Sequence, residues 1–299
     1  MDATVASIAG RSGDKLTRRA IAWIRDVPPE RPLHLLINYF DAHAPYAPPP
    51  PYDDLPRAKA RLSIKQEDVN RGQPFLPHQR AAYIARYDGE IRFIDHHFGL
   101  LLDALRETGR YDEAMIIVVA DHGESFGEHG LMGHSRWLYE EVLRVPLIIR
   151  FPGGRDAGEE IQEPVSVVDL LPLIGREVRL SMPGGLEGVP VGHRDLVLAE
   201  SYRSRYAVGN WGPRFDRDLT AGIHWPWKLV LTDRGMPEFY RLDEDPDELI
   251  NRAGDATEVD LREALKLARE ALEPPKGVSL PEDVSPETHQ RLRSLGHVE

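Results

Sequence analysis

Three short apolar runs, set between long amphipathic stretches, constrain the fold of this chain more than any other feature of its sequence. The runs are LHLLINYF at 33–40, MIIVVA at 115–120 and VPLII at 145–149. Each has the length of one strand and is far shorter than the ~20 residues that cross a bilayer. Apolar runs of this length are typical of strands that are buried within a sheet.

Between the first two runs, residues 83–105 predict a long amphipathic helix. Apolar residues recur there at steps of three and four, and Gly109 is placed to end the helix. A shorter helix is predicted at 16–24. Strands that alternate with helices favour an α/β fold, in which a mixed, largely parallel sheet is flanked by helices.

The pattern changes after Pro183. Short strands separated by turns and one late helix are predicted there, at 195–200, 228–232, 238–242 and 259–272. We therefore expect an α/β domain over residues 1–183 and a smaller, antiparallel α+β subdomain over residues 184–299.

Composition excludes several classes of function. Lysine and arginine number 37 against 49 aspartate and glutamate, a net charge of −12, so nucleic acid is not an expected partner. The absence of cysteine excludes disulfides, thiolate metal sites and a cysteine nucleophile. No stretch is long and apolar enough for a membrane span, and residues 1–15 show no signal-peptide pattern, so the sequence assigns no compartment.

Two residues that commonly bind metals follow the second apolar run. Asp121 and His122 stand at the carboxyl end of the predicted strand, where open α/β sheets bind ligands. Gly123 permits a turn that lets both side chains face one site. A carboxylate and an imidazole can bind one divalent cation, with Glu124 in support. Taken alone, a DHG triplet is more often a turn or a helix cap.

Two further segments carry histidines. His43 follows the first apolar run in a loop that Pro45 fixes, and alone it is typical of a surface histidine. The segment from Gly127 to His134 holds three glycines, so its backbone can approach a ligand closely. Its two histidines could be metal ligands, acids or donors to an anion, although loop histidines are more often structural or solvated.

The order of the motifs is more specific than any one of them. The chain contains FDAHAPY at 40–46, YDGEIRFID at 87–95, ADHGESFGEHGLMGH at 120–134 and LYEEVLRVPLIIRFPG at 138–153. In this order it resembles the sulfatases of the alkaline phosphatase superfamily, from about Leu16 to its last residue. The resemblance implies an alkaline phosphatase-like fold and a metal-dependent hydrolase of sulfate monoesters, with an aryl or carbohydrate substrate.

The resemblance also implies a role for each matching residue. Asp121 and His122 match the metal ligands of the DHG element, with Ca²⁺ as the expected ion and Mn²⁺ or Mg²⁺ as alternatives. His43 matches the histidine that contacts the sulfate or its leaving-group oxygen. His134 matches the basic residue that binds the sulfate. His43 and His134 are therefore the expected catalytic and substrate-binding residues, and either could protonate the departing alcohol.

One half of the sulfatase pattern is not matched. The family carries C-x-P-x-R or S-x-P-x-R, whose first residue becomes the formylglycine nucleophile, and paired aspartates that complete the metal site. The nearest segment, Ser181 to Gly185, lacks the arginine. We therefore expect an incomplete, C-terminal portion of a sulfatase, with formylglycine in a missing N-terminal half. Such a chain should expose an unpaired sheet edge, bind metal weakly and show no turnover alone.

Two other functions stay open. A phosphate or phosphonate ester hydrolase of the same superfamily is compatible with histidine, rather than asparagine, at position 122. A non-catalytic sulfatase-like half that needs a partner chain is also compatible. We expect the loop from Arg203 to Asp218, with Trp211, to build the substrate pocket, and the acidic Asp245 to Glu248 cluster to be a structural turn.

Overall fold

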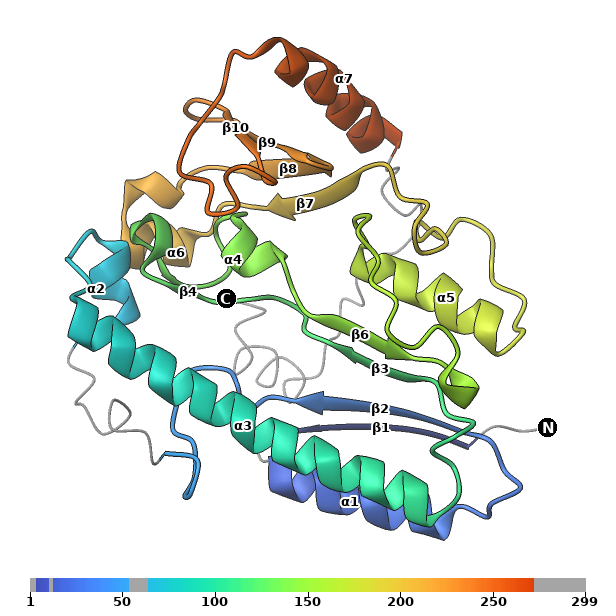
Figure 1. Cartoon of the computed structure of the whole chain (residues 1–299). Helices are drawn as coiled ribbons and strands as arrows, with labels where there is room; N and C mark the ends of the chain where they lie inside the picture. The colour runs from blue at the N-terminus through green and yellow to red at the C-terminus, as the bar shows by residue number, and fades with distance from the viewer. Residues whose placement is uncertain (1–3, 11–12, 54–63, 272–299) are drawn as a thin grey trace. The chain divides into compact units, whose positions relative to one another are not determined.

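The computed structural model describes residues 4–10, 13–53 and 64–271 (Figure 1). The chain divides into two compact units, residues 1–134 with 144–160 and residues 135–143 with 161–299. The domain boundary at 183–184 stays a prediction. Within the described ranges, no helix combines the length and the apolar character that a membrane span requires.

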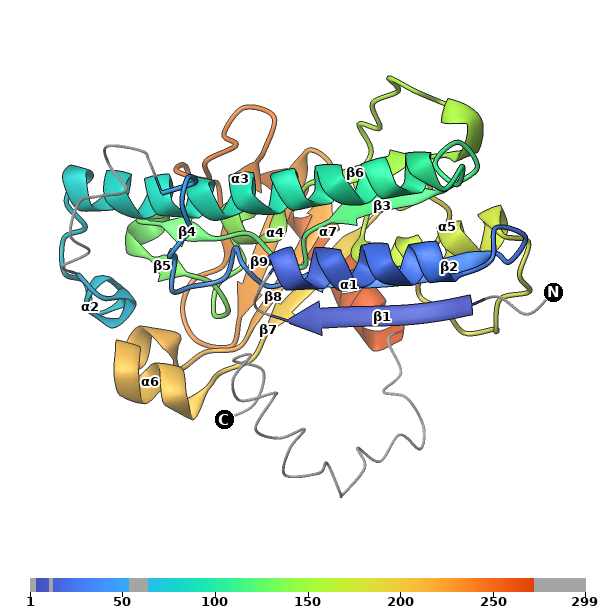
Figure 2. The same ribbon diagram turned by 90° about the horizontal axis from the view of Figure 1, so that it is seen from below.

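The first unit packs two helices against a parallel pair of strands. Its elements in chain order are β1 (Thr4–Gly10), α1 (Gly13–Asp26), β2 (Leu33–Tyr39), α2 (Gln66–Asn70), α3 (Pro77–Glu107), β3 (Ile116–Val119), β4 (Ser125–Phe126), β5 (Met132–Gly133) and β6 (Leu147–Arg150). Helix α1 connects β1 to β2, the crossover that parallel strands need. Helix α3 lies along α1 (Figures 1 and 2).

Helices α1 and α3 form the core of this unit. Leu16, Ala20 and Ile24 of α1 pack against Leu101 and Leu105 of α3. Both helices were predicted from their apolar periodicity. Helix α3 starts earlier than expected, at a proline in the first turn, where a proline is readily accommodated.

The strands of the first unit are covered on one face only among the described residues. In β2, the side chains of Leu35 and Ile37 face the helices, whereas Leu36 is 59% exposed. Ile148 of β6 is 64% exposed. The prediction of buried strands is therefore wrong for alternate residues, because successive side chains point to opposite faces of a sheet and a helical layer covers one of them.

The prediction of a largely parallel sheet is not confirmed. Strands β1 and β2 are parallel, but β3 pairs antiparallel with β6, and β4 pairs antiparallel with β5. The segment between β3 and β6 contains a short hairpin and the four-residue helix α4 rather than a long crossover helix. Among the described strands, β2 pairs with β1 alone and β3 pairs with β6 alone.

The second unit is built on a four-stranded antiparallel sheet, which confirms the predicted C-terminal architecture. Its elements are α4 (Glu140–Leu143), α5 (Leu170–Glu177), β7 (Val197–Ser201), α6 (Arg205–Trp211), β8 (Leu219–His224), β9 (Trp227–Thr232), β10 (Glu238–Arg241) and α7 (Ala256–Ala271). The strand order is β10-β9-β8-β7.

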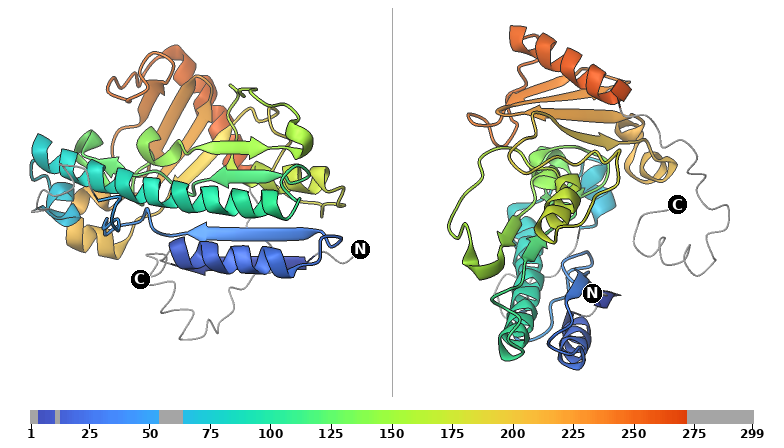
Figure 3. Two further views of the ribbon diagram at one scale, coloured as in Figure 1. Left: turned by 60° about the horizontal axis from the view of Figure 1, so that its bottom comes forward. Right: turned by 90° about the vertical axis from the view of Figure 1, so that its right-hand side faces the viewer.

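The sequence did not predict strand β8. Its residues LTAGIH lack a continuous apolar run, and the strand forms because β7 and β9 pair with it on both sides. Helix α7 covers one face of the sheet (Figures 1 and 3). It packs so closely that a Cβ at Gly222 would lie 2.9 Å from Leu265 Cδ1. The other face packs against Leu138 of the 135–143 segment.

A buried ion triad joins three parts of this unit. The Lys228 ammonium, on β9, lies 2.9 Å from Glu140 Oε1 and 2.8 Å from Glu248 Oε1. The Glu140 N–H donates to Glu248 Oε2 at 2.6 Å. In the same turn, the Asp245 carboxylate accepts from the N–H groups of Leu249 and Ile250. The acidic cluster at 245–248 is thus a structural turn.

Replacing Lys228 by methionine should destabilise the chain by about 3–5 kcal/mol, because the buried Glu248 carboxylate and the partly buried Glu140 carboxylate lose their cation. Urea unfolding measures this loss. Lys266→Met, at an exposed position on α7, is the matched control and should change stability by less than about 0.5 kcal/mol. A second change, Glu248→Gln in the Lys228→Met background, should recover part of the loss. Equal stability of the Lys228 and Lys266 variants would contradict the role of the triad.

Candidate active site

A small hairpin brings the two ends of the segment 124–134 together. Strands β4 and β5 pair with Ser125 opposite Gly133. One further step of this register brings Glu124 opposite His134, and Glu124 Oε1 lies 3.0 Å from His134 Nδ1. The hairpin therefore fixes the position of His134 relative to the loop after β3.

Asn70 of α2 holds strand β5 in place. Its buried side chain donates to the Met132 carbonyl at 3.1 Å and accepts from the Met132 N–H at 2.8 Å. The next residue, Gly133, has a φ of 88°, a left-handed backbone conformation that other residues adopt only with strain. This conformation favours glycine immediately before His134.

The three histidines predicted to act together do lie together. The rings of His122 and His134 stack with their centroids 3.9 Å apart, and the His43 ring meets the His134 ring edge-on at 5.3 Å. His43 comes from the loop after β2, His122 from the loop after β3 and His134 from the residue after β5. Three chain segments thus converge within the first unit.

Each of these rings uses Nδ1 to bind an oxygen. Nδ1 of His43 lies 2.7 Å from the Ala44 carbonyl, and Nδ1 of His122 lies 2.8 Å from the Gly123 carbonyl. A carbonyl oxygen can only accept, so each Nδ1 carries a hydrogen. Nε2 is therefore the ring nitrogen that can bind a metal in the neutral form, or donate to an anion when the ring is protonated.

Burial affects the protonation of His43. Removal from water lowers the pKa of His43; the Ala44 carbonyl opposes this effect, and the neighbouring His134 adds to it. The neutral imidazole is therefore favoured, and the imidazolium, once formed, is a stronger acid than that of a free histidine.

Asp121 and His122, the predicted metal ligands, have oxygen and nitrogen donor atoms that lie close together. The Asp121 carboxylate is 80% exposed, and its Oδ1 lies 3.8 Å from His122 Nε2. Across the described ranges, no group of three or more His, Cys, Asp or Glu side chains is arranged to hold a metal. Because Ca²⁺ takes about six to eight oxygen ligands, this pair would be part of a larger coordination shell.

Glu124 contacts both His134 and Tyr46. Its side chain is 4% exposed, and its Oε2 accepts from the Tyr46 hydroxyl at 2.6 Å. Burial, together with Glu124, raises the pKa of Tyr46 far above its usual range, so the hydroxyl stays a donor. The support of a metal ligand by Glu124 stays a prediction; in the structure its carboxylate orients His134. The Tyr46 ring is surrounded by other aromatic rings, those of Tyr83, Tyr87 and Phe126.

Glu90 of α3 is a second buried carboxyl near the site. It is 5% exposed, and its Oε1 accepts from the Ala47 N–H at 2.8 Å. Burial raises its pKa to about 7; the Ala47 N–H lowers it and the charge of Asp41 raises it. Glu90 was not predicted from the sequence as a site residue. Glu90 lies three residues before Phe93, and residues at this spacing share one face of a helix. This spacing is the sequence feature that could have indicated that Glu90 is buried.

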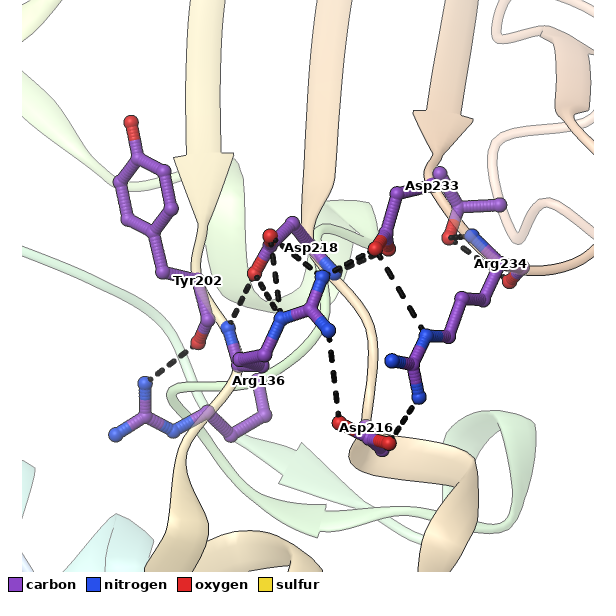
Figure 4. A network of polar contacts seen from close by, with 8 residues as sticks. Arg136, Tyr202, Asp216, Asp218, Asp233 and Arg234 are labelled. Carbon is purple, nitrogen blue, oxygen red and sulfur yellow. Dashed lines mark hydrogen bonds and ion pairs between the residues drawn. The ribbon is translucent and has the colours of Figure 1, made fainter.

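The predicted substrate loop lies in the second unit and is held by ion pairs at its ends. Arg203 follows β7. Its Nη2 lies 2.9 Å from Asp218 Oδ2, and its Nη1 lies 3.7 Å from Asp216 Oδ1. It also pairs with Asp233, and Arg234 pairs with Asp216 (Figure 4). The network ties the end of β7 to the start of β8 and the end of β9.

Trp211 of this loop is not a surface residue. It is 8% exposed and packs against Trp137 and Phe215, with ring centroids 6.2 Å and 5.2 Å away. The place of Trp211 in a substrate pocket stays a prediction, and what the structure shows is a packing role. The large exposed rings of this region are those of Tyr202 and Tyr206.

Tyr46→Phe should destabilise the first unit by about 1.5–3 kcal/mol, because it removes a hydrogen bond to a buried carboxylate. Tyr83→Phe is the matched control, since the Tyr83 hydroxyl of the same aromatic cluster donates to a neutral carbonyl, that of Ile64. Its loss should be about 0.5–1.5 kcal/mol. Thermal or urea unfolding compares the two variants, and an equal loss would argue against a charged acceptor at Glu124.

Glu90→Gln should become more stable relative to the wild type as the pH rises. The native pKa of about 7 exceeds the ordinary value of 4.5 for a glutamate, so the unfolded chain releases the Glu90 proton first. Wild-type stability therefore falls between about pH 4.5 and 7, by up to about 3 kcal/mol, and glutamine avoids this loss. Urea unfolding at pH 5 and pH 8 tests it; a stability difference independent of pH would contradict the raised pKa.

Comparison with known proteins identifies the family. Residues 4–176 match the family model described as Sulfatase, and residues 127–274 match the one described as N-sulphoglucosamine sulphohydrolase, C-terminal. An arylsulfatase of Clostridium perfringens is 27% identical over 254 residues, which cover 79% of this chain and 52% of that protein. The multifunctional alkaline phosphatase superfamily protein PehA of Trinickia caryophylli is 27% identical over 283 residues, covering 80% and 55%.

A solved structure shows the same fold. The phosphonate monoester hydrolase of Agrobacterium radiobacter superposes with a TM-score of 0.66 at 23% identity, over 87% of this chain and 59% of that one. The chain spans about half the length of the curated relatives it matches. Since the Sulfatase model matches more than half of the residues, the chain belongs to the sulfatase family.

Proposed function

We propose that the histidine cluster of the first unit binds the anionic group of a sulfate monoester in a metal-dependent hydrolysis. The observation that carries this proposal is the convergence of His43, His122 and His134. Their Nδ1 atoms all bind oxygens, so their Nε2 atoms can serve one ligand.

Each residue has a distinct role in this proposal. Asp121 and His122 would hold the divalent cation, with Ca²⁺ expected and Mn²⁺ or Mg²⁺ as alternatives. When bound, such an ion neutralises charge on the sulfate oxygens. His134, oriented by Glu124, donates from Nε2 to a sulfate oxygen. His43 lies at the leaving-group oxygen and, when protonated, donates its Nε2 proton to the departing alcohol.

The residues of this sequence do not include the nucleophile of a sulfatase. The sequence has no cysteine, and Ser181 is not followed by the arginine of the S-x-P-x-R motif. Formylglycine is therefore not expected to arise from these residues. We propose that the chain alone binds a cation and an oxyanion weakly and shows no turnover.

A second candidate function is hydrolysis of a phosphate or phosphonate ester. Histidine at position 122 is compatible with it, and the fold is shared with a phosphonate monoester hydrolase. A sulfate ester is a monoanion, whereas a phosphate monoester is largely a dianion at neutral pH. A phosphate ester therefore needs more positive charge from its binding site than a sulfate ester does. The relative affinities of the chain for the two kinds of anion can separate the two functions.

The proposal is tested by binding measurements on the full chain with labelled histidine side chains. Ca²⁺ should shift the His122 signals, and sulfate added afterwards should shift those of His43 and His134. His134→Gln should weaken sulfate binding at least about tenfold, or about 1.4 kcal/mol. His78→Gln, at an exposed histidine of α3, is the control and should leave both titrations unchanged.

Three outcomes would change these proposals. Tighter binding of methyl phosphate, which is largely a dianion, than of methyl sulfate, a monoanion, favours the second function. Histidine signals that respond to neither the cation nor the anions overturn both proposals. Robust metal-dependent hydrolysis of an aryl sulfate by the chain alone would contradict the absence of turnover, while leaving the binding roles in place.

A further inference from the structure

We infer that Glu90 is a positioning residue for His43, whose loop its carboxylate holds against helix α3. The inference rests on the proposed role of His43 in binding the ester. It concerns the loop from Asp41 to Tyr52, which begins two residues before His43 and crosses α3 at Glu90.

The end of this loop rests directly on α3. A Cβ at Gly89 would lie 2.7 Å from Pro48 Cγ and 2.7 Å from the Tyr52 carbonyl oxygen, so glycine is what permits the contact. Arg92, one turn further along the helix, donates to the same Tyr52 carbonyl at 2.6 Å. These contacts fix the part of the loop that follows Ala47.

The start of the loop is tied to helix α1. Asp41 Oδ1 accepts from the Gly13 N–H at 3.1 Å, at the first residue of that helix. His43 follows two residues later, and its ring stacks on Phe40 with centroids 4.6 Å apart. Both ends of the loop are therefore anchored, and the Glu90–Ala47 contact lies between them.

The contact with Ala47 is linked to the His43 ring through the backbone. Tyr46 packs its ring against Tyr87, one turn before Glu90 on the same face of α3. Two residues before Tyr46, the Ala44 carbonyl binds His43 Nδ1 at 2.7 Å. If the Ala47 N–H lost its hydrogen bond to Glu90, the backbone from Ala44 to Ala47 could move. The Ala44 carbonyl would then no longer hold His43 Nδ1, and the His43 ring would lose its orientation.

Stability alone does not explain a carboxylate at this position. A glutamine could accept from the same N–H without the cost of a buried charge. The carboxylate does form a stronger, charge-assisted hydrogen bond. Glu90 also lines a cavity of about 590 Å³ whose described lining residues include no lysine or arginine. The titratable side chains that line it with Glu90 are those of Asp14, Asp41, His43, Tyr52, His96 and His97.

The experiment follows the Ala47 amide and the His43 ring by NMR in the labelled full chain. In the wild type, the Ala47 amide proton should move downfield with a midpoint near pH 7, the pKa of Glu90. Glu90→Gln should abolish this movement, and Glu90→Ala should also weaken the nuclear Overhauser contact between His43 and Phe40 at pH 8. Asp88→Asn is the matched control, because Asp88 is an exposed carboxylate of the same helix.

Each outcome has a defined meaning. An Ala47 amide that still titrates in Glu90→Gln would overturn the inference, because another group would then be its partner. An unchanged His43–Phe40 contact in Glu90→Ala would also overturn it, because the loop would not depend on Glu90. If both effects are seen but sulfate leaves the His43 signals unmoved, Glu90 positions the loop and the proposed function is what fails.

Discussion

The carboxylate of Glu124, shared by the Tyr46 hydroxyl and the His134 ring, is the interaction on which the candidate site depends. It joins the loop after β2 to the hairpin of β4 and β5, two segments far apart in sequence. A carboxylate buried to this degree must satisfy its oxygens within the protein, because water is not there to do it. Its two partners therefore hold each other in place, and His43 and His134 meet as a result.

Buried charge has the same architectural use elsewhere in the chain. Glu90 binds a backbone N–H of the His43 loop, and Lys228 joins α4 to the sheet and to the turn at Glu248. In each case a buried ionisable side chain connects segments that have no shared secondary structure. Such contacts are costly to bury and strongly destabilising to break, so they specify where a segment lies more than they add to stability.

Much of the fold could be predicted because it follows from local patterns. Helices α1 and α3 follow from the 3.6-residue periodicity of their apolar residues, and strands β2, β3 and β6 from their apolar runs. Strand direction could not be predicted, because β3 and β6 pair antiparallel through a hairpin-containing connection that the apolar pattern does not encode. Strand β8 was missed because its formation depends on two neighbours rather than on its own residues.

The sequence by itself determined the family, the candidate site histidines and the metal-type pair Asp121–His122, because motif identity and order are properties of the chain. The tertiary structure decided what orients those residues. The register of the β4–β5 hairpin places Glu124 opposite His134. Asn70 binds the backbone of β5, the strand that precedes His134. Glu90 of α3 binds the backbone of the His43 loop. These are contacts between segments distant in sequence, and packing in three dimensions alone selects such partners.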